Sequence, residues 1–157
     1  MASIRKEFTI DASPDQVWSA VRDWGALHER LVPGFVTDVQ LDGTDRIVTF
    51  FTGVVAREVF VDLDDDARRL VWSVVDGPFS HDNASAQVFE HPGGGTRFLW
   101  TNDFLPNDEE LVERIDQLMQ RGAETIKQTM EASAGRSRFT EARVGGSAGP
   151  NLLARSG

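Results

Sequence analysis

The chain of 157 residues predicts one α+β domain, in which a curved seven-stranded antiparallel sheet wraps around a long C-terminal helix. Short runs of alternating apolar and polar residues, separated by turn residues, fill residues 35–105 and predict consecutive strands. Residues 108–130 repeat apolar side chains at helical spacing over many turns. A sheet with one face to bury, and one long helix to cover it, must curve around that helix.

The first elements are a strand and two short helices. Residues 3–10 alternate between apolar and charged side chains, which predicts a strand with one wet face. Ser13 and Gln16 form a capping box around a proline, so a helix begins there and continues to about Arg22. A second short helix over 27–31 ends before a Pro-Gly pair.

Six further strands follow with short links, so neighbouring strands pair antiparallel. Asp42-Gly43 and the Pro-Gly-Gly-Gly segment over 92–95 are typical hairpin turns. The acidic residues 108–110 then occupy the first turn of the long helix, where the helix dipole favours negative charge. The predicted strands are 35–41, 46–52, 54–63, 69–75, 81–90 and 96–105.

The periodic pattern ends near residue 132. Residues 133–157 are rich in Gly and Ser, carry a net positive charge and show no sustained periodicity. We therefore predict one folded domain over 1–132 and a disordered tail over 133–157.

Composition excludes several function classes. Sixteen basic against 25 acidic residues give a net charge of −9, which disfavours nucleic acid and anionic lipid as partners. The absence of cysteine removes disulfides and thiolate chemistry. The chain has no apolar run long enough for a membrane span and no signal peptide, so a cytoplasmic monomer or homodimer is expected. Neither a nucleotide-binding motif nor a metal-binding motif is present, so no cofactor and no metal are expected.

Three segments carry a family resemblance: IDASPDQVW over 10–18, the stretch 57–70, and GTRFLW over 95–100. With the element order, they resemble the START/Bet v 1-like (SRPBCC) helix-grip superfamily, and within it the polyketide cyclase/dehydrase and lipid-transport group. The resemblance implies a helix-grip fold with a ligand cavity between sheet and helix. The expected function is binding of a small hydrophobic ligand (polyketide-, lipid- or sterol-like) as a carrier or binder. The alternative is a cofactor-free polyketide cyclase or aromatase using acid–base residues in the same cavity.

Strand periodicity predicts part of the cavity wall, because every second side chain shares a face. Phe98, Trp100 and Asn102 share one face of the last strand, and Trp72 and Val74 share one face of the strand 69–75. The long helix is expected to supply the cavity floor from one side: Ile115, Met119, Gly122 and Ile126. The missing side chain at Gly122 either widens the cavity or lets the helix pack closely on the sheet.

Two strands are harder to assign. Both faces of 54–63 carry apolar residues, but a resemblance to the plant abscisic-acid receptors implies that Glu58 lines the cavity, together with Ala56 and Phe60. In the strand 81–90, hydrophobicity alone turns the alanines and Val88 inward. The same receptor resemblance instead implies that Asn83 and Ser85 face the cavity, and we favour this second assignment.

Three residues are candidates for chemistry. Glu58 in an apolar cavity can act as a general acid or base or anchor a polar ligand group; otherwise it faces solvent and pairs with an Arg of the next strand. His28 in the second short helix can shuttle protons near the cavity mouth, unless it is simply exposed. His81 begins its strand at the expected rim, where it would act with Asn83, unless it is simply exposed.

Overall fold

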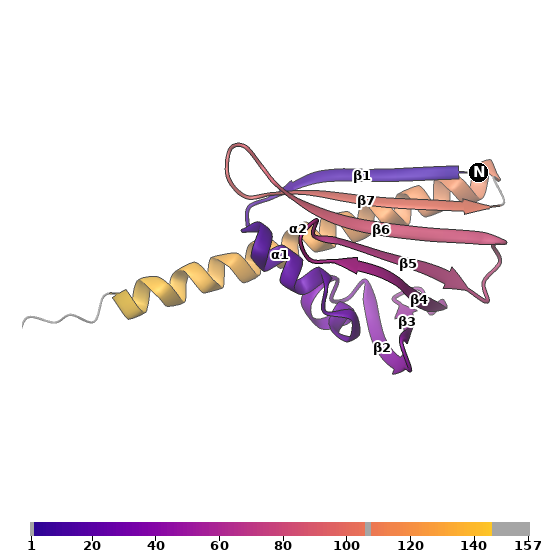
Figure 1. Ribbon diagram of the computed structural model, residues 1–157, viewed down its shortest axis with the longest axis horizontal. Helices are drawn as coiled ribbons and strands as arrows, with labels where there is room; N and C mark the ends of the chain where they lie inside the picture. The colour runs from indigo at the N-terminus through magenta and orange to yellow at the C-terminus, as the bar shows by residue number, and fades with distance from the viewer. Residues whose placement is uncertain (1, 106–107, 146–157) are drawn as a thin grey trace, which may run out of the picture.

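The computed structural model describes residues 2–105 and 108–145 and confirms the predicted α+β fold (Figure 1). The strands follow the predicted runs closely, and three short helical segments lie between the first and second strands. In chain order the elements are β1 (Ala2–Ile10), α1 (Pro14–Val21), η1 (Trp24–Ala26), η2 (Leu27–Leu31), β2 (Val36–Asp42), β3 (Asp45–Phe50), β4 (Val55–Asp64), β5 (Arg69–Val75), β6 (His81–Glu90), β7 (Thr96–Leu105) and α2 (Glu109–Gly145).

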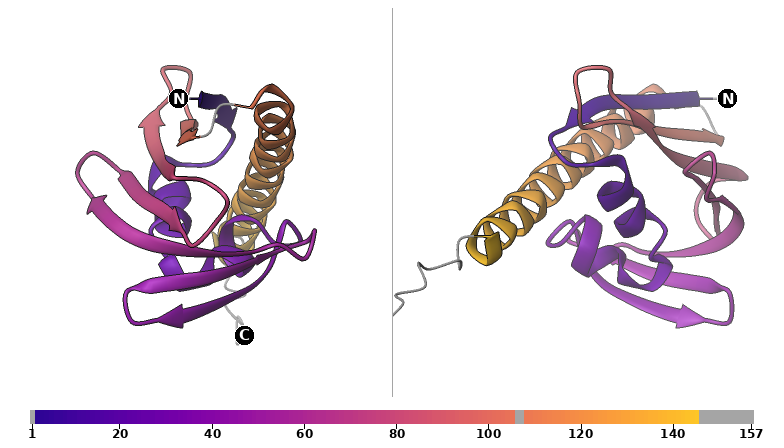
Figure 2. Two further views of the ribbon diagram at one scale, coloured as in Figure 1. Left: turned by 90° about the vertical axis from the view of Figure 1, so that its right-hand side faces the viewer. Right: turned by 60° about the vertical axis from the view of Figure 1, so that its left-hand side comes forward.

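The seven strands form one antiparallel sheet in the order β1-β7-β6-β5-β4-β3-β2. Each strand pairs with its neighbour in sequence, except that β1 pairs with β7, from Ala2 opposite Phe104 to Ile10 opposite Thr96. The sheet curves, and α2 runs along its concave side (Figure 2). The architecture is that of a helix-grip fold.

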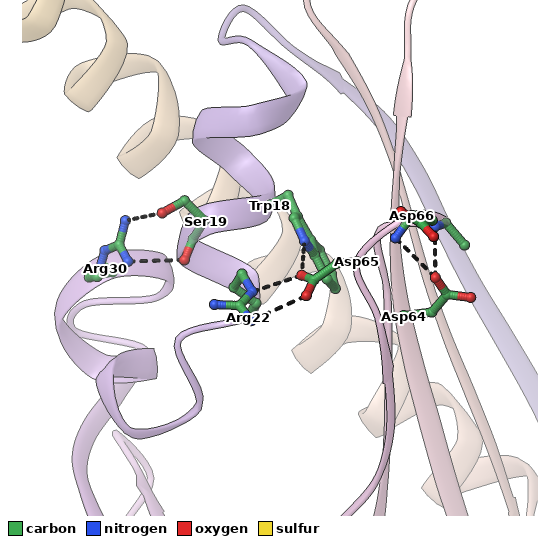
Figure 3. A network of polar contacts seen from close by, with 8 residues as sticks. Trp18, Ser19, Arg22, Arg30, Asp64, Asp65 and Asp66 are labelled. Atoms are coloured by element: carbon green, nitrogen blue, oxygen red, sulfur yellow. Dashed lines mark hydrogen bonds and ion pairs between the residues drawn. The ribbon is translucent and has the colours of Figure 1, made fainter.

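The predicted capping box starts α1. Ser13 Oγ accepts a hydrogen bond from Gln16 N at 3.2 Å, and Gln16 Oε1 accepts from Ser13 N at 3.4 Å. The β4–β5 turn then holds this helix: Trp18 Nε1 and Arg22 Nε donate to Asp65 Oδ1 at 2.8 and 2.9 Å (Figure 3). The hydrogen bond from Trp18 lowers the pKa of Asp65, and the hydrogen bond from Arg22 has a smaller effect in the same direction. These bonds fix one end of the concave face.

The short helix predicted over 27–31 is present, but it is a π-helix, and a 3₁₀ turn over Trp24–Ala26 precedes it. A π-turn closes its hydrogen bonds over five residues, as Val32 N does by donating to Leu27 O at 2.9 Å. Leu27 and Leu31 from this helix face the sheet and reach the cavity described below.

The long helix α2 continues beyond the predicted boundary. Residues 133–145 belong to the helix, which projects past the edge of the sheet, so the expectation of disorder from residue 133 is wrong for this stretch (Figure 1). Ala134 is buried against the core, which explains why helix formation persists despite the Gly and Ser content. Residues 146–157 of the expected tail lie outside the described residues, and the domain boundary itself stays a prediction.

Two apolar clusters hold α2 to the sheet. The larger one joins the α1 side chains, the middle of the sheet, and Ile126, Met130 and Ala134 of α2. The smaller one packs Met119 of α2 on Phe104 and the first residues of β1. In the described part of the chain, no helix has the length and apolar character needed to cross a membrane.

Candidate functional site

A cavity of about 600 Å³ lies between the concave face of the sheet and α2. Its volume is within the range of pockets that hold small organic ligands. Val54, Val55 and Leu118 belong to its wall and are also 60%, 59% and 40% exposed, so the cavity opens to solvent beside the β3–β4 turn and α2. Six aromatic side chains line it: Phe35, Phe50, Trp72, Phe79, Phe98 and Trp100.

Most of the predicted wall residues line this cavity. Those from β5, β7 and one side of α2 are the ones that strand and helix periodicity predicted, and those from β4 are the ones that the receptor resemblance implied. These residues are Ala56, Glu58, Trp72, Val74, Phe98, Trp100, Asn102, Ile115, Met119 and Ile126. Their position in the wall is a structural observation, whereas their roles in ligand binding remain predictions.

The assignment of β6 is wrong. His81, Asn83 and Ser85 do not line the cavity, and the intervening side chains do. Asp82, Ala84 and Ala86 all belong to the wall and are at most 9% exposed. The hydrophobic alternation of the strand therefore gives the correct face, and the resemblance to the abscisic-acid receptors does not transfer to these positions.

Phe60 also lies outside the wall, although it was expected there with Ala56 and Glu58. It pairs with Trp72, so it belongs to the concave face, but the ring of Trp24 packs edge-on against it at 5.5 Å between centroids. A bulge at Val61 separates Phe60 from Leu63, which pairs with Leu70. This extra residue explains why both faces of the strand read as apolar, since the alternation changes phase within it.

Gly122 does not line the cavity but allows close packing next to it. A Cβ atom at this position would lie 2.9 Å from Trp100 Cζ3 and 3.3 Å from Phe35 Cε1. Of the two roles predicted for Gly122, the close approach of helix and sheet is therefore the one observed. Its hydrogen atom lets the Trp100 ring sit flush against α2.

His28 lies apart from the cavity wall. Its Nε2 atom is 3.5 Å from Glu29 Oε1, and its Nδ1 atom is enclosed without a hydrogen-bond partner in the part of the chain that the structure describes. The position removes the support for a proton shuttle acting directly on a cavity ligand, because a general acid or base must come within hydrogen-bond reach of the reacting group.

Glu58 is buried in the wall and is paired with Arg46 of the adjacent strand. Arg46 Nε and Nη2 donate to Glu58 Oε1 at 3.1 and 2.8 Å, and Arg46 Nη1 donates to the Trp24 carbonyl at 3.1 Å. Both residues are at most 4% exposed. The two alternatives considered for Glu58 are thus combined: it faces the cavity and forms an ion pair with a neighbouring arginine.

The Trp24 ring covers the guanidinium group. Arg46 Cζ lies 3.7 Å from its centroid, and the Trp72 ring is 5.7 Å from Cζ on the sheet side. Burial lowers the pKa of Arg46, while Glu58 opposes that change through its charge and hydrogen bonds. An arginine so held remains positively charged at neutral pH, and its charge is directed toward Glu58.

Asp82 is a second carboxyl group in the cavity. Burial raises the pKa of this residue to about 6, the negative charge of Glu58 acts in the same direction, and His81 opposes it. In the amide orientation that satisfies its polar atoms, Asn102 Nδ2 donates to Asp82 Oδ1 at 3.1 Å and to the Asn83 carbonyl at 3.3 Å. Asp82 therefore exchanges its proton near pH 6 rather than near pH 4.

Arg46 and Asp82 were absent from the predicted site, although strand alternation contained the signal. Arg46 shares a strand face with Val48 and Phe50, and Asp82 shares one with Ala84 and Ala86. The pattern does not identify either residue by itself, because a charged side chain is usually expected to point to solvent. Within the described ranges, no three His, Asp or Glu side chains converge in a way that would hold a metal ion.

Comparison with known proteins identifies a family whose model matches most of the chain. Residues 1–131 match the family described as polyketide cyclase/dehydrase and lipid transport. No curated protein matches the chain significantly.

Three solved structures illustrate the similarity of fold. An uncharacterized Bacillus thuringiensis protein is 20% identical (TM-score 0.74; 82% of this chain and 98% of that chain covered). XoxI from Bacillus cereus is 22% identical (TM-score 0.74; 83% and 96% covered). A START superfamily protein from Mycobacterium smegmatis is 11% identical (TM-score 0.66; 85% and 97% covered). At these identities the likeness concerns the fold alone.

Proposed function

Since the chain belongs to the polyketide cyclase/dehydrase and lipid transport family, we propose that it binds one small hydrophobic ligand in the cavity, as a carrier or binder. The observation that carries the proposal is the cavity itself: about 600 Å³, lined largely by apolar side chains and open to solvent at one side. Burying apolar ligand surface there provides the main driving force for binding.

The aromatic part of the wall favours planar or polycyclic ligands. Trp72, Phe98 and Trp100 line the sheet side, and Phe35 and Phe79 approach from the flanking segments. Aromatic rings pack on flat apolar ligands with a large contact area and little loss of side-chain entropy. Polyketide-like and sterol-like molecules therefore fit the wall better than short polar metabolites.

A dye-binding experiment tests the proposal. Nile red is expected to bind saturably to the purified protein with a large gain in fluorescence, and Ala84→Phe is expected to reduce its affinity at least about tenfold because the new ring occupies the cavity. Leu118 lines the cavity where it opens to solvent, so Leu118→Trp is expected to obstruct the entrance without disturbing the interior. Fluorescence titration measures both effects.

Ser85→Phe is the matched control, because Ser85 is the neighbour of Ala84 on β6 but does not line the cavity. Its ring is expected to leave dye affinity unchanged. Binding that survives Ala84→Phe and Leu118→Trp would place the dye elsewhere and contradict the proposed function. Loss of binding in Ser85→Phe alone would restore the receptor-based assignment of β6.

A cofactor-free cyclase or aromatase is a second candidate function. The specific observation that favours it is Asp82, a cavity carboxyl group whose pKa is raised to about 6 by burial and by the charge of Glu58. A carboxyl group that exchanges its proton near pH 6 is suited to general acid–base catalysis in the cavity.

Asp82→Asn separates the two candidates. An enzyme of this type would convert an aromatic polyketide precursor, and the substitution would abolish conversion while leaving Nile red binding intact. Conversion is measured by chromatography of the products. If unaltered protein binds such a compound and releases it unchanged, the carrier function stands and the enzymatic one is rejected.

A further inference from the structure

The polar end of the cavity contains more negative than positive charge. Among the residues that the structure describes, its interior carries one cation, Arg46, and two carboxyl groups, Glu58 and Asp82. Arg57 and Asp76 also belong to the wall, but Arg57 is occupied by Asp45 and Asp42, each at 2.7 Å. These partners raise the pKa of Arg57 and keep its charge at the surface.

The single interior cation is already engaged. The donors of Arg46 go to Glu58 Oε1 and the Trp24 carbonyl, and the Trp24 ring covers the face of the group at 3.7 Å. Only 3% of its side chain is exposed. A ligand anion would have to share this guanidinium with a carboxylate already bound to it, and mutual repulsion opposes that arrangement.

Two carboxyl oxygen atoms remain open. Among the described residues no group donates a hydrogen bond to Glu58 Oε2, and Asn102 is directed at Oδ1 of Asp82 rather than Oδ2. Neither oxygen belongs to the fully enclosed polar atoms that lack a partner. Both residues are nevertheless buried in the wall, so these oxygens reach the open space of the cavity.

We propose that the ligand carries a hydrogen-bond donor, a hydroxyl or ammonium group, which binds to Asp82 and Glu58, and that the cavity discriminates against carboxylates. This inference rests on the proposed ligand-binding function and specifies its chemical class. A buried acceptor lowers the free energy of a complex when a donor satisfies it, and a ligand carboxylate would place a third negative charge beside two others. Helix α2 lines the cavity with apolar side chains and contributes no competing charge there.

Three probes with one ring system test the inference: 2-(2-naphthyl)ethylamine, 2-(2-naphthyl)ethanol and 2-naphthylacetate. Each is titrated against the Nile red complex of the unaltered protein at pH 7.5, and displacement of the dye is measured. The amine and the alcohol are expected to bind at least about tenfold more tightly than the carboxylate, the effect of roughly one unfavourable charge contact in a partly solvated cavity. Asp82→Asn is expected to reduce that discrimination about tenfold.

Asp103→Asn is the matched control, because Asp103 lies opposite Asn83, is absent from the cavity wall and sits beside Asn102 on β7. It is expected to preserve the order of the three probes. Lowering the pH to 5 offers a test without any substitution: Asp82 gains a proton, and the relative affinity for naphthylacetate rises. The charged groups that act on Asp82 are Glu58, which is paired with Arg46, and the adjacent His81. If Asp82 is the group whose protonation changes the affinity, Asp82→Asn removes most of this pH dependence.

The outcomes distinguish the two proposals. If Ala84→Phe fails to block Nile red, the cavity is not the binding site and the proposed function fails. If Nile red binds in the cavity but naphthylacetate displaces it as well as or better than the amine and the alcohol, the donor inference is overturned and the binding function remains. Failure of the amine and the alcohol to displace cavity-bound dye overturns the inference as well.

Discussion

The ion pair between Arg46 and Glu58 is the most consequential contact at the scale of single residues. Two charges have been removed from water, and each is stabilised by the other at 2.8 Å. Had Glu58 been buried without a cation, replacing it with Gln would have been neutral or stabilising. The presence of Arg46 reverses that expectation, because the substitution leaves a buried, uncompensated positive charge.

Glu58→Gln is therefore expected to lower the free energy of unfolding by about 3 kcal/mol. Removing the charges together, in Arg46→Met/Glu58→Leu, is expected to cost much less, since a well-packed apolar pair avoids the desolvation of both ions. Urea denaturation of Arg46→Met, of Glu58→Leu and of the double variant measures the coupling between the two residues. Additive effects of the single substitutions would show that the pair contributes little.

At the scale of elements, the contact of α2 with β7 depends on Gly122. Gly in a helix costs about 1 kcal/mol relative to Ala, yet a methyl group here would lie 2.9 Å from the Trp100 ring. The close approach of helix and sheet therefore outweighs helix propensity at this position.

Gly122→Ala is expected to lower the free energy of unfolding by about 1–2 kcal/mol, because overpacking outweighs the gain in propensity. It should also weaken Nile red binding by pushing Trp100 into the cavity. Gly135→Ala is the matched control in the same helix: a Cβ atom there meets nothing within 4 Å, so it is expected to stabilise by up to about 1 kcal/mol. Thermal and urea unfolding compare the two. Equal stabilisation by both substitutions would contradict the packing argument.

The elements also show what a single sequence can predict. Periodicity predicts the number of strands, the order of the elements and the side of α2 that faces the sheet. It does so because burial of one face of a strand or helix requires apolar residues at regular spacing. The bulge at Val61 is not visible in the same way, since an extra residue shifts the alternation without any distinctive residue type. For Asn83 and Ser85 the resemblance to a distant receptor predicts the wrong face, whereas the alternation of Ala84 and Ala86 predicts the correct one.

Local sequence patterns predict neither the full length of α2 nor the ion pair between Arg46 and Glu58. Residues 133–145 have the composition of a loop, but Ala134 packs on the core formed by residues far earlier in the chain. Arg46 and Glu58 are 12 residues apart and meet only because β3 and β4 pair in one register. Such a pair depends on the tertiary structure. A charged residue in an apolar strand face indicates a buried partner only when the pairing of the strands is already known.

At the scale of the whole molecule, Asp82 makes stability depend on pH. Its pKa is raised from 3.8 to about 6, mainly by burial, so the folded protein binds more protons than the unfolded chain between these values. Stability contributed by this group therefore decreases as the pH rises from about 4 to about 6 and stays low above that. The sign is opposite to that of a carboxylate held by a salt bridge.

Asp82→Asn removes this penalty. It is expected to raise the free energy of unfolding by about 1–2 kcal/mol at pH 7.5, after allowance for solvent in the cavity, and to have almost no effect at pH 4. Urea denaturation at a series of pH values measures the difference. A difference between the two proteins that stays constant from pH 4 to pH 8 would show that Asp82 is ionised alike in both states.

The pairing of β1 with β7 has a consequence for how the molecule reaches its native state. The sheet is complete only when Ala2 pairs with Phe104 and Ile10 pairs with Thr96. Closing a loop of this size has a substantial entropic cost before any of its contacts are gained, so the rate-limiting step of folding is expected to involve this last ladder. During synthesis the N-terminal strand leaves the ribosome long before its partner does. Until then its backbone hydrogen-bonding groups stay available to other chains, and the alternating charges of Arg5 and Glu7 limit such pairing.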